Sequence, residues 1–249
     1  MNKVVALGVC FVVGILSWLV FPTGGVPILA YHQVSDADDI YSVTATQFEE
    51  QMNYLASKGY TGISLEELFS FYEGKGTLPK NPIVITFDDG YEDNFLTALP
   101  IMEKYHMRST VFVVAGLVGT PEYLSWQQIG EMQDRHTEIG SHTVSHLGLN
   151  TLNSESQRRE IVDSKAILEK HIGRPVQFLA YPYGQFSSIT EELLGEAGYK
   201  GACSGIAGLN SKGVDRYALK RVNVPHPRYG LWEFRLRLFR AHLYSKLGI

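Results

Sequence analysis

Two adjacent carboxylates directly follow an apolar run of the sequence. Residues 83–87 (Ile-Val-Ile-Thr-Phe) are typical of a buried strand, and Asp88, Asp89 and Gly90 come next. Asp-Asp-Gly by itself is common in solvated turns. Two ionised carboxylates side by side repel each other, so such a pair is tolerated where a cation neutralises one of them or where one works as an acid or a base. The pair is therefore a candidate for metal binding or acid–base chemistry.

Two histidines four positions apart follow another expected strand. His142 and His146 come directly after residues 138–141. On one helical turn, side chains at positions i and i+4 face the same way. Two imidazoles and one carboxylate form a ligand set that leaves coordination positions open for water and substrate. Alone, the histidines are compatible with a surface or capping pair, but together with Asp88 and Asp89 they predict a metal centre.

Both stretches resemble the motifs of a known family. Residues 86–90 (Thr-Phe-Asp-Asp-Gly) and 141–146 (Ser-His-Thr-Val-Ser-His) resemble the first two motifs of the polysaccharide deacetylases, the NodB-homology or carbohydrate esterase family 4 group. The resemblance extends from about Pro27 to Pro227 and implies a distorted (β/α)7 barrel. It also implies that Asp88 is the general base and that the metal ligands are Asp89, His142 and His146. Zinc is the default metal for this set, and related sites also take cobalt, nickel or iron.

Residues 180–184 (Ala-Tyr-Pro-Tyr-Gly) resemble the third motif of the family. In that motif the residue after the proline supplies a backbone N–H to the developing oxyanion, which implies this role for Tyr183. We expect Tyr181 to contribute to substrate binding. Ala180 departs from the family pattern, because many members have an arginine there that orients the base. The departure is familiar in the branch that acts on poly-N-acetylglucosamine of biofilm matrices.

The opening strand adds a candidate for the general acid. Residues 27–32 (Pro-Ile-Leu-Ala-Tyr-His) resemble the Tyr-His strand of extracellular biofilm-polysaccharide deacetylases, in which the histidine is the general acid. This implies His32, although a histidine packed at a strand end without a catalytic task has the same pattern. His226 is the alternative acid, because other family members take their acid from a Leu-x-His motif near the last strand, and His226 also follows a predicted strand. If His226 is not the acid, we expect it among the substrate-binding residues. Trp126 matches a family position where an aromatic ring either stacks on a sugar or fills the helix–barrel interface.

Short apolar or β-branched runs alternate with helical patterns from Pro27 onward, which is typical of βα units and a mainly parallel sheet. Seven strands are expected, at residues 27–31, 83–87, 110–114, 138–141, 176–181, 201–204 and 219–224. A barrel and an open doubly wound sheet both fit this count, and both gather loops at the carboxyl ends of the strands.

Helix-start signals lie between the expected strands. Capping boxes are predicted at Thr46 with Glu49, at Ser64 with Glu67, and at Ser125 with Gln128. The helices predicted with definite bounds cover residues 46–57, 154–171 and 189–196.

The chain begins with an apolar segment. Residues 4–20 are 17 residues without a charge, preceded by Lys3 and followed by the helix-stopping residues 21–25. We favour an uncleaved membrane anchor over a cleaved signal peptide, because the run is long and a clear cleavage site is lacking. The catalytic domain, expected at residues 26–230, then faces the extracytoplasmic side, and the protein is secreted if the segment is cleaved.

Residues 231–249 are predicted to form a basic amphipathic helix. Its apolar residues fall at helical spacing beside basic ones, and the apolar set is Trp232, Leu236, Phe239, Leu243 and Leu247. Such a helix can lie on a membrane surface. The simpler interpretation, which we favour here, is a last helix that covers the barrel with a solvated basic edge.

The composition argues against nucleic-acid binding and against a cysteine-based zinc site. The 249 residues include 22 Lys plus Arg against 26 Asp plus Glu, a balance without the basic field that nucleic acid needs, and two cysteines are too few for a cysteine-based zinc site. We predict a metal-dependent N-deacetylase of an extracytoplasmic polymer, poly-β-1,6-N-acetylglucosamine, with a possible functional link to a polysaccharide synthase. The alternatives are peptidoglycan, chitin oligomers, acetylxylan or a lipid-linked amino sugar as substrate, and a non-catalytic carbohydrate-binding module.

Overall fold

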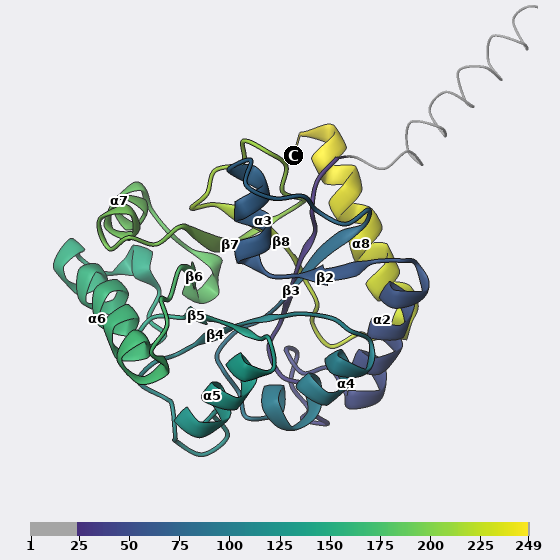
Figure 1. Cartoon of the computed structure of the whole chain (residues 1–249), viewed down its shortest axis with the longest axis horizontal. Helices are drawn as coiled ribbons and strands as arrows, with labels where there is room; N and C mark the ends of the chain where they lie inside the picture. The colour runs from purple at the N-terminus through teal and green to yellow at the C-terminus, as the bar shows by residue number, and fades with distance from the viewer. Residues whose placement is uncertain (1–23, 249) are drawn as a thin grey trace, which may run out of the picture.

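The computed structural model describes residues 24–248 (Figure 1). The expected membrane segment, residues 4–20, lies outside this range. Within it, no helix combines the length and the apolar character needed to cross a bilayer.

Seven parallel strands form a closed ring (Figure 1). They pair in the order β1-β8-β7-β6-β5-β4-β3, and β1 also pairs with β3, which closes the barrel. The expected (β/α)7 barrel is therefore confirmed, and the open sheet is excluded. The ring consists of β1 (Ile28–Tyr31), β3 (Pro82–Phe87), β4 (Thr110–Val113), β5 (Glu138–Ser141), β6 (Phe178–Ala180), β7 (Gly201–Ala207) and β8 (Leu219–Asn223).

The barrel is distorted on one side. Strands β5 and β6 share a single register pair, Ser141 with Leu179, and the pairing of β7 with β8 is irregular between Cys203 and Ala207. The longest regular pairings lie elsewhere, between β1 and β3 and between β4 and β5, with four register pairs each.

A short eighth strand, β2 (Thr61–Ile63), was not expected from the sequence. It pairs with the first half of β3, through Gly62 and Ile83, while β4 pairs with the second half of β3. Three residues with a central glycine carry too little β-propensity to be recognised. Gly62 is required by packing, because a Cβ atom there would come within 2.6 Å of the Arg108 backbone nitrogen.

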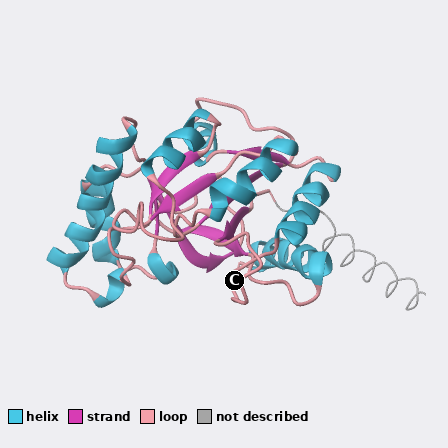
Figure 2. Cartoon of the chain, turned by 90° about the horizontal axis from the view of Figure 1, so that it is seen from below, coloured by secondary structure: helices cyan, strands magenta, loops and turns pink. Residues whose placement is uncertain are grey.

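Helices surround the strands (Figure 2). The α-helices are α2 (Ala45–Ser57), α3 (Leu65–Tyr72), α4 (Leu99–Lys104), α5 (Trp126–Asp134), α6 (Ser154–Ile172), α7 (Ser188–Glu196) and α8 (Gly230–Leu247). The shorter turns are η1 (Asn94–Ala98), η2 (Leu149–Thr151) and η3 (Pro182–Gly184).

Two of the three predicted capping boxes are confirmed, at Ser64 and at Ser125. The third is wrong. Helix α2 is capped by Thr44, whose side chain accepts from the backbone N–H of Gln47 while the Gln47 side chain accepts from the backbone of Thr44. Thr44 has the extended backbone (φ −64°, ψ 154°) that a cap requires, whereas Thr46 already lies inside the first turn.

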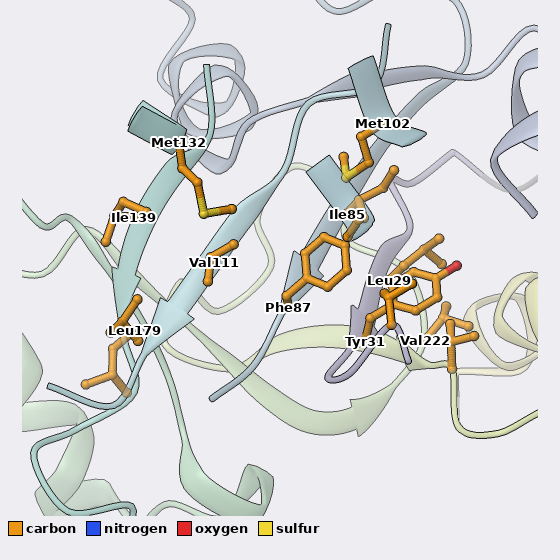
Figure 3. Close-up of a cluster of buried hydrophobic side chains, with 14 of the residues drawn as sticks. Leu29, Tyr31, Ile85, Phe87, Met102, Val111, Met132, Ile139, Leu179 and Val222 are labelled. Carbon is orange, nitrogen blue, oxygen red and sulfur yellow. The ribbon is translucent and has the colours of Figure 1, made fainter. Parts of the chain in front are cut away.

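The core has two parts because strand residues alternate between the two faces of the sheet. Outward side chains such as Leu29, Ile85 and Val111 pack against helices, where Met102 and Met132 meet them (Figure 3). Inward side chains form a second, smaller cluster inside the barrel, which includes Ile28, Val84, Phe112, Phe178, Cys203 and Leu219. Apart from the mouth, the barrel interior is therefore filled with side chains.

Candidate active site

The strand period directs three functional side chains into the barrel mouth. On β3 the inward residue Val84 is followed at period two by Thr86 and then by Asp88. The same two-residue period places His32, which follows β1, and Arg221 of β8 on the inward face. Asp88, His32 and Arg221 line one cavity of about 390 Å³.

That cavity collects most of the residues that the sequence predicted. Seven of them line it, namely His32, Asp88, Asp89, His142, His146, Tyr181 and Tyr183. Trp126 and His226 do not line it. The carboxyl ends of β1, β3, β5 and β6 therefore meet at one site, as the barrel requires.

Asp89, His142 and His146 form a cluster whose ligand atoms all lie within 4.8 Å of one another. Asp89 Oδ1 is 3.4 Å from His142 Nε2 and 3.2 Å from His146 Nε2. In a tetrahedral site with bonds of about 2.0–2.1 Å, neighbouring ligand atoms are about 3.4 Å apart. The buried Asp89 Oδ1 makes no hydrogen bond within the described residues, so it lacks the partner that a cation would supply.

The charge states of the cluster also suit a cation. Burial raises the pKa of Asp89, but the two imidazoles lower it by more, so the group is an anion. His142 Nδ1 lies 2.7 Å from the Ala180 carbonyl oxygen. Because a carbonyl only accepts, Nδ1 carries the proton and Nε2 keeps its lone pair for a metal. The residues present therefore fit a divalent metal.

The loop that carries His142 and His146 does not form the helical turn that the spacing suggested. Residues 142–146 are not helical, and Thr143 (φ 69°) and His146 (φ 56°) have left-handed backbones. Glu160 of α6 fixes this loop, because its carboxylate accepts from the backbone N–H groups of Val144 and Ser145 at 2.9 and 2.8 Å. Loop geometry set by a distant helix thus brings the two imidazoles together, and sequence spacing gave the right pair for the wrong reason.

Backbone strain gathers at the same place. Among the described residues, seven other than glycine have a positive φ, and four of them belong to the site motifs, namely Asp89, Thr143, His146 and Tyr183. Such conformations persist only where the surrounding contacts hold them, and they gather at functional sites.

Arg221 is the functional residue that the sequence reasoning missed. Its Nη1 lies 2.8 Å from Asp88 Oδ1, and its Nε donates to the Ser204 carbonyl. Only 7% of Arg221 is exposed. Burial by itself raises the pKa of Asp88, but the Arg221 guanidinium and the nearby imidazoles outweigh it, so the pKa lies below its ordinary value. Asp88 is consequently ionised and oriented, as a general base must be.

This contact also accounts for Ala180. Where the family pattern has a base-orienting arginine, this chain has an alanine, and β8 supplies the arginine to the same carboxylate instead. The sequence held one signal for it: Leu219, Arg221 and Asn223 alternate along an expected strand, so an arginine shares a face with a core leucine.

The structure separates the two general-acid candidates. His32 Nε2 lies 4.0 Å from Asp88 Oδ2, and the His32 ring packs on Tyr41 at the cavity wall. His226 instead donates from Nδ1 to the Ser42 carbonyl, and its backbone N–H bonds to Ile40. His226 therefore anchors the segment that presents Tyr41, and His32 is the histidine within reach of the reacting groups.

The aromatic residues take different positions. Tyr183 lies over His146, with ring centroids 4.9 Å apart, and 69% of it is exposed at the mouth. Tyr181 is fully buried in the wall, where its hydroxyl donates to the Tyr217 carbonyl. The Trp126 ring stacks on His171 at 4.0 Å, between α5 and α6, which corresponds to the interface-filling alternative.

Comparison with known proteins agrees with this geometry. The model of the Polysaccharide deacetylase family matches residues 75–202, more than half of the chain. The chain therefore belongs to the polysaccharide deacetylase family, and it is an enzyme of that family.

Individual relatives cover more of the chain. It is 32% identical over 198 residues to YxkH of Bacillus subtilis (strain 168), whose name places it among the polysaccharide deacetylases; the match covers 80% of this chain and 71% of YxkH. It is 31% identical to the poly-β-1,6-N-acetyl-D-glucosamine N-deacetylase of Staphylococcus aureus (strain MRSA252), over 64% of this chain and 60% of that protein. The solved structure of the Streptococcus pyogenes deacetylase PplD in complex with acetate is similar with a TM-score of 0.78 and 26% identity, over 89% of this chain and 99% of that chain.

Proposed function

We propose that this protein is a metal-dependent N-deacetylase of an extracytoplasmic amino-sugar polymer, poly-β-1,6-N-acetylglucosamine. The observation that carries the proposal is the placement of Asp88, held by Arg221, beside the cluster of Asp89, His142 and His146 in one cavity. A base next to a cation site is the arrangement that hydrolysis of an unreactive amide needs.

The residues of the cavity divide the reaction between them. Asp89, His142 and His146 would hold a divalent cation, which would supply a Lewis acid to polarise the acetyl carbonyl and to make water a better nucleophile. Asp88 accepts the proton of the attacking water, and Arg221 keeps this carboxylate ionised and aimed. The backbone N–H of Tyr183 donates to the oxyanion that develops on the carbonyl oxygen.

The leaving amine needs a proton, and His32 is placed to give it. Burial lowers the pKa of His32 more than Asp88 and Asp89 raise it, so the free site holds a neutral imidazole at pH 7. His32 must therefore gain a proton during the cycle, and Asp88, which has just accepted one, is its nearest acidic neighbour. The products are acetate and a free amine on the sugar.

Two features support a neutral amino-sugar polymer as substrate. The cavity mouth presents the exposed rings of Tyr41 and Tyr183, on whose apolar faces sugar rings can stack. The Staphylococcus aureus relative acts on poly-β-1,6-N-acetyl-D-glucosamine according to its name.

The test is acetate release from purified poly-β-1,6-N-acetylglucosamine by the full chain, with and without a chelator. The Asp88→Asn variant removes the base, and Asp163→Asn, an exposed position on α6, is the matched control. We expect release by the wild type and by the control, and a loss of at least about 100-fold with chelator or with Asp88→Asn.

Two results would count against the proposal. Activity unaffected by both the chelator and Asp88→Asn would refute the mechanism. Release from peptidoglycan, chitin oligomers or acetylxylan, and not from poly-β-1,6-N-acetylglucosamine, would refute the substrate while leaving the hydrolytic chemistry in place.

A further inference from the structure

Helix α8 has two opposite apolar faces, and the barrel uses only one of them. Phe234, Leu238 and Ala241 are buried where the helix packs on α2 and β8. Phe234 meets the Tyr54 ring of α2 edge-on, with centroids 6.2 Å apart. The expectation that α8 covers the barrel therefore describes this face alone.

The other face carries a stripe of apolar side chains, which we call the outer stripe. It consists of Trp232, Leu236, Phe239, Leu243 and Leu247, spaced by three or four residues so that they share one side of the helix. Exposed fractions are 61% for Trp232, 47% for Phe239 and 52% for Leu247. Among the described α-helices, no other exposes more than one large apolar side chain. Packing against the barrel therefore does not account for the apolar character of these positions.

Basic side chains border the outer stripe on both sides. At 100° per residue, Arg235 and Lys246 fall along one edge, and Arg237 and Arg240 fall along the other. Glu233 is the one carboxylate in the sequence of α8, and it is paired with Arg237 at 2.6 Å. The Arg240 guanidinium bonds to the Tyr244 hydroxyl, which leaves its charge uncompensated by that contact. The face is apolar at its centre and cationic at its edges.

The described chain begins next to the end of this helix, and the uncharged run of residues 4–20 precedes it in the sequence. Val26 pairs with Asn210, and the neighbouring Leu209 N–H donates to Ser245 Oγ in the last turn of α8. Figure 1 shows the purple beginning of the described chain beside the yellow helix. The described chain therefore begins beside the last turn of α8.

We propose that α8 lies in the surface of an anionic phospholipid bilayer, with the outer stripe inserted among the acyl chains and the flanking arginines at the phosphates. A helix in the plane of the interface has this apolar centre and these cationic edges. A second copy of the chain fits less well, because a symmetric pairing through the stripe brings the two sets of arginines together.

A bilayer-bound α8 would set the direction in which the active-site mouth opens relative to the membrane. Helix α8 starts after the carboxyl end of β8, on the mouth side, and ends near Val26, which precedes β1 on the opposite side. The helix therefore runs along the barrel axis. With α8 flat on a bilayer, the barrel axis is parallel to the membrane, and the active-site mouth opens sideways toward polymer that runs along the surface.

Trp232 provides a direct test in the full chain. The sequence has three tryptophans, so Trp18→Phe and Trp126→Phe leave Trp232 as the only reporter. The protein is reconstituted into vesicles of phosphatidylglycerol and phosphatidylcholine whose acyl chains are brominated near the interface. We expect Trp232 emission to shift to shorter wavelength and to be quenched by at least about half relative to unbrominated vesicles of the same composition.

Charge variants in the same single-tryptophan protein test whether the basic side chains contribute to binding of the bilayer. Arg235→Gln with Arg240→Gln is expected to reduce the quenching at least twofold, whereas the control Arg158→Gln, on α6, leaves it unchanged. Unquenched emission at the wavelength of water-exposed tryptophan in phosphatidylglycerol vesicles would overturn the proposal. Equal quenching in pure phosphatidylcholine would overturn the anionic surface. A blue shift without vesicles that disappears on dilution would assign the stripe to a second copy and also overturn it.

Discussion

At the scale of single residues, the proposed base is held by a contact across the barrel. Asp88 follows β3, and the guanidinium that holds it comes from Arg221 of β8, 133 positions later in the sequence. Both groups are buried, so their interaction is stronger than that of a surface pair, and removal of one leaves the other uncompensated. Arg221 does not touch the reacting atoms in this arrangement and is a positioning residue.

We expect Arg221→Gln to lower kcat by about 100-fold, because the base loses both its orientation and the charge that keeps it ionised. KM should change by less than about threefold, since Arg221 acts on the base rather than on the sugar. Arg221→Lys should recover part of the loss because it restores the charge without the second bond to Ser204. Acetate release measured over a range of substrate concentrations separates kcat from KM. A variant that keeps its kcat and raises only KM would show that Arg221 binds substrate instead.

At the scale of elements, strand ends deliver the site and helices fix its loops. The carboxylates come from the end of β3 and the histidines from the loop after β5, but that loop depends on α6 for its shape. Without Glu160, the part-buried N–H groups of Val144 and Ser145 would lose their carboxylate acceptor, and the turn would lose the two bonds that tie it to α6. A residue that touches neither substrate nor metal thus controls the position of both imidazoles.

Glu160→Ala should weaken metal binding by about 10- to 100-fold, in the range found for groups that orient metal ligands from outside the coordination sphere. Glu160→Gln keeps an acceptor oxygen and should retain most of the affinity, and Asp163→Asn on the same helix should be neutral. Competition between the protein and a chromophoric zinc chelator measures the affinity. Wild-type affinity in Glu160→Ala would mean that the loop holds its shape alone.

The cap of α2 offers a second test at this scale. Thr44→Ala removes the acceptor of the Gln47 N–H and should lower the free energy of unfolding by about 1 kcal/mol. Thr46→Ala, inside the first turn, should have an effect near zero, because alanine is the better helix former. Urea unfolding followed by circular dichroism compares the two. A larger loss from Thr46→Ala would place the start of the helix where the sequence pattern first suggested.

At the scale of the whole molecule, a metal held by Asp89, His142 and His146 would join parts of the barrel that are far apart in sequence. Asp89 and the histidine pair are separated by more than fifty residues, and they follow β3 and β5, two strands that are not neighbours in the ring. A ligand that binds only the native state stabilises it according to its concentration and affinity.

Zinc at about 100 times its dissociation constant should therefore raise the unfolding free energy by about 2.7 kcal/mol, or the Tm by roughly 5–10 °C for a chain of this size. Thermal unfolding of the chelated protein, with and without added zinc, measures the shift. His146→Ala should abolish most of it, while His171→Ala, on the surface end of α6, should not. An equal shift in the His146 variant would place the stabilising metal elsewhere.

The sequence by itself determined the features that depend on near neighbours. Strand period, helix caps at Ser64 and Ser125, and the motifs at Asp88-Asp89 and His142–His146 are written in residues a few positions apart, because each reflects local backbone geometry. The resemblance to a family then added the barrel and the roles of the site residues. Even the missed cap at Thr44 was a local error of two positions.

Tertiary structure alone decided what depends on closure of the barrel. It placed His32 near Asp88 and His226 away from the cavity, stacked Trp126 on His171, and brought Arg221 to Asp88, where the family pattern has an arginine at position 180. It also showed that α8 buries one apolar face and leaves the other uncovered. The physical reason is the same in each case: these contacts join residues far apart in the chain, and which of them meet is fixed only when the strands pair into a ring.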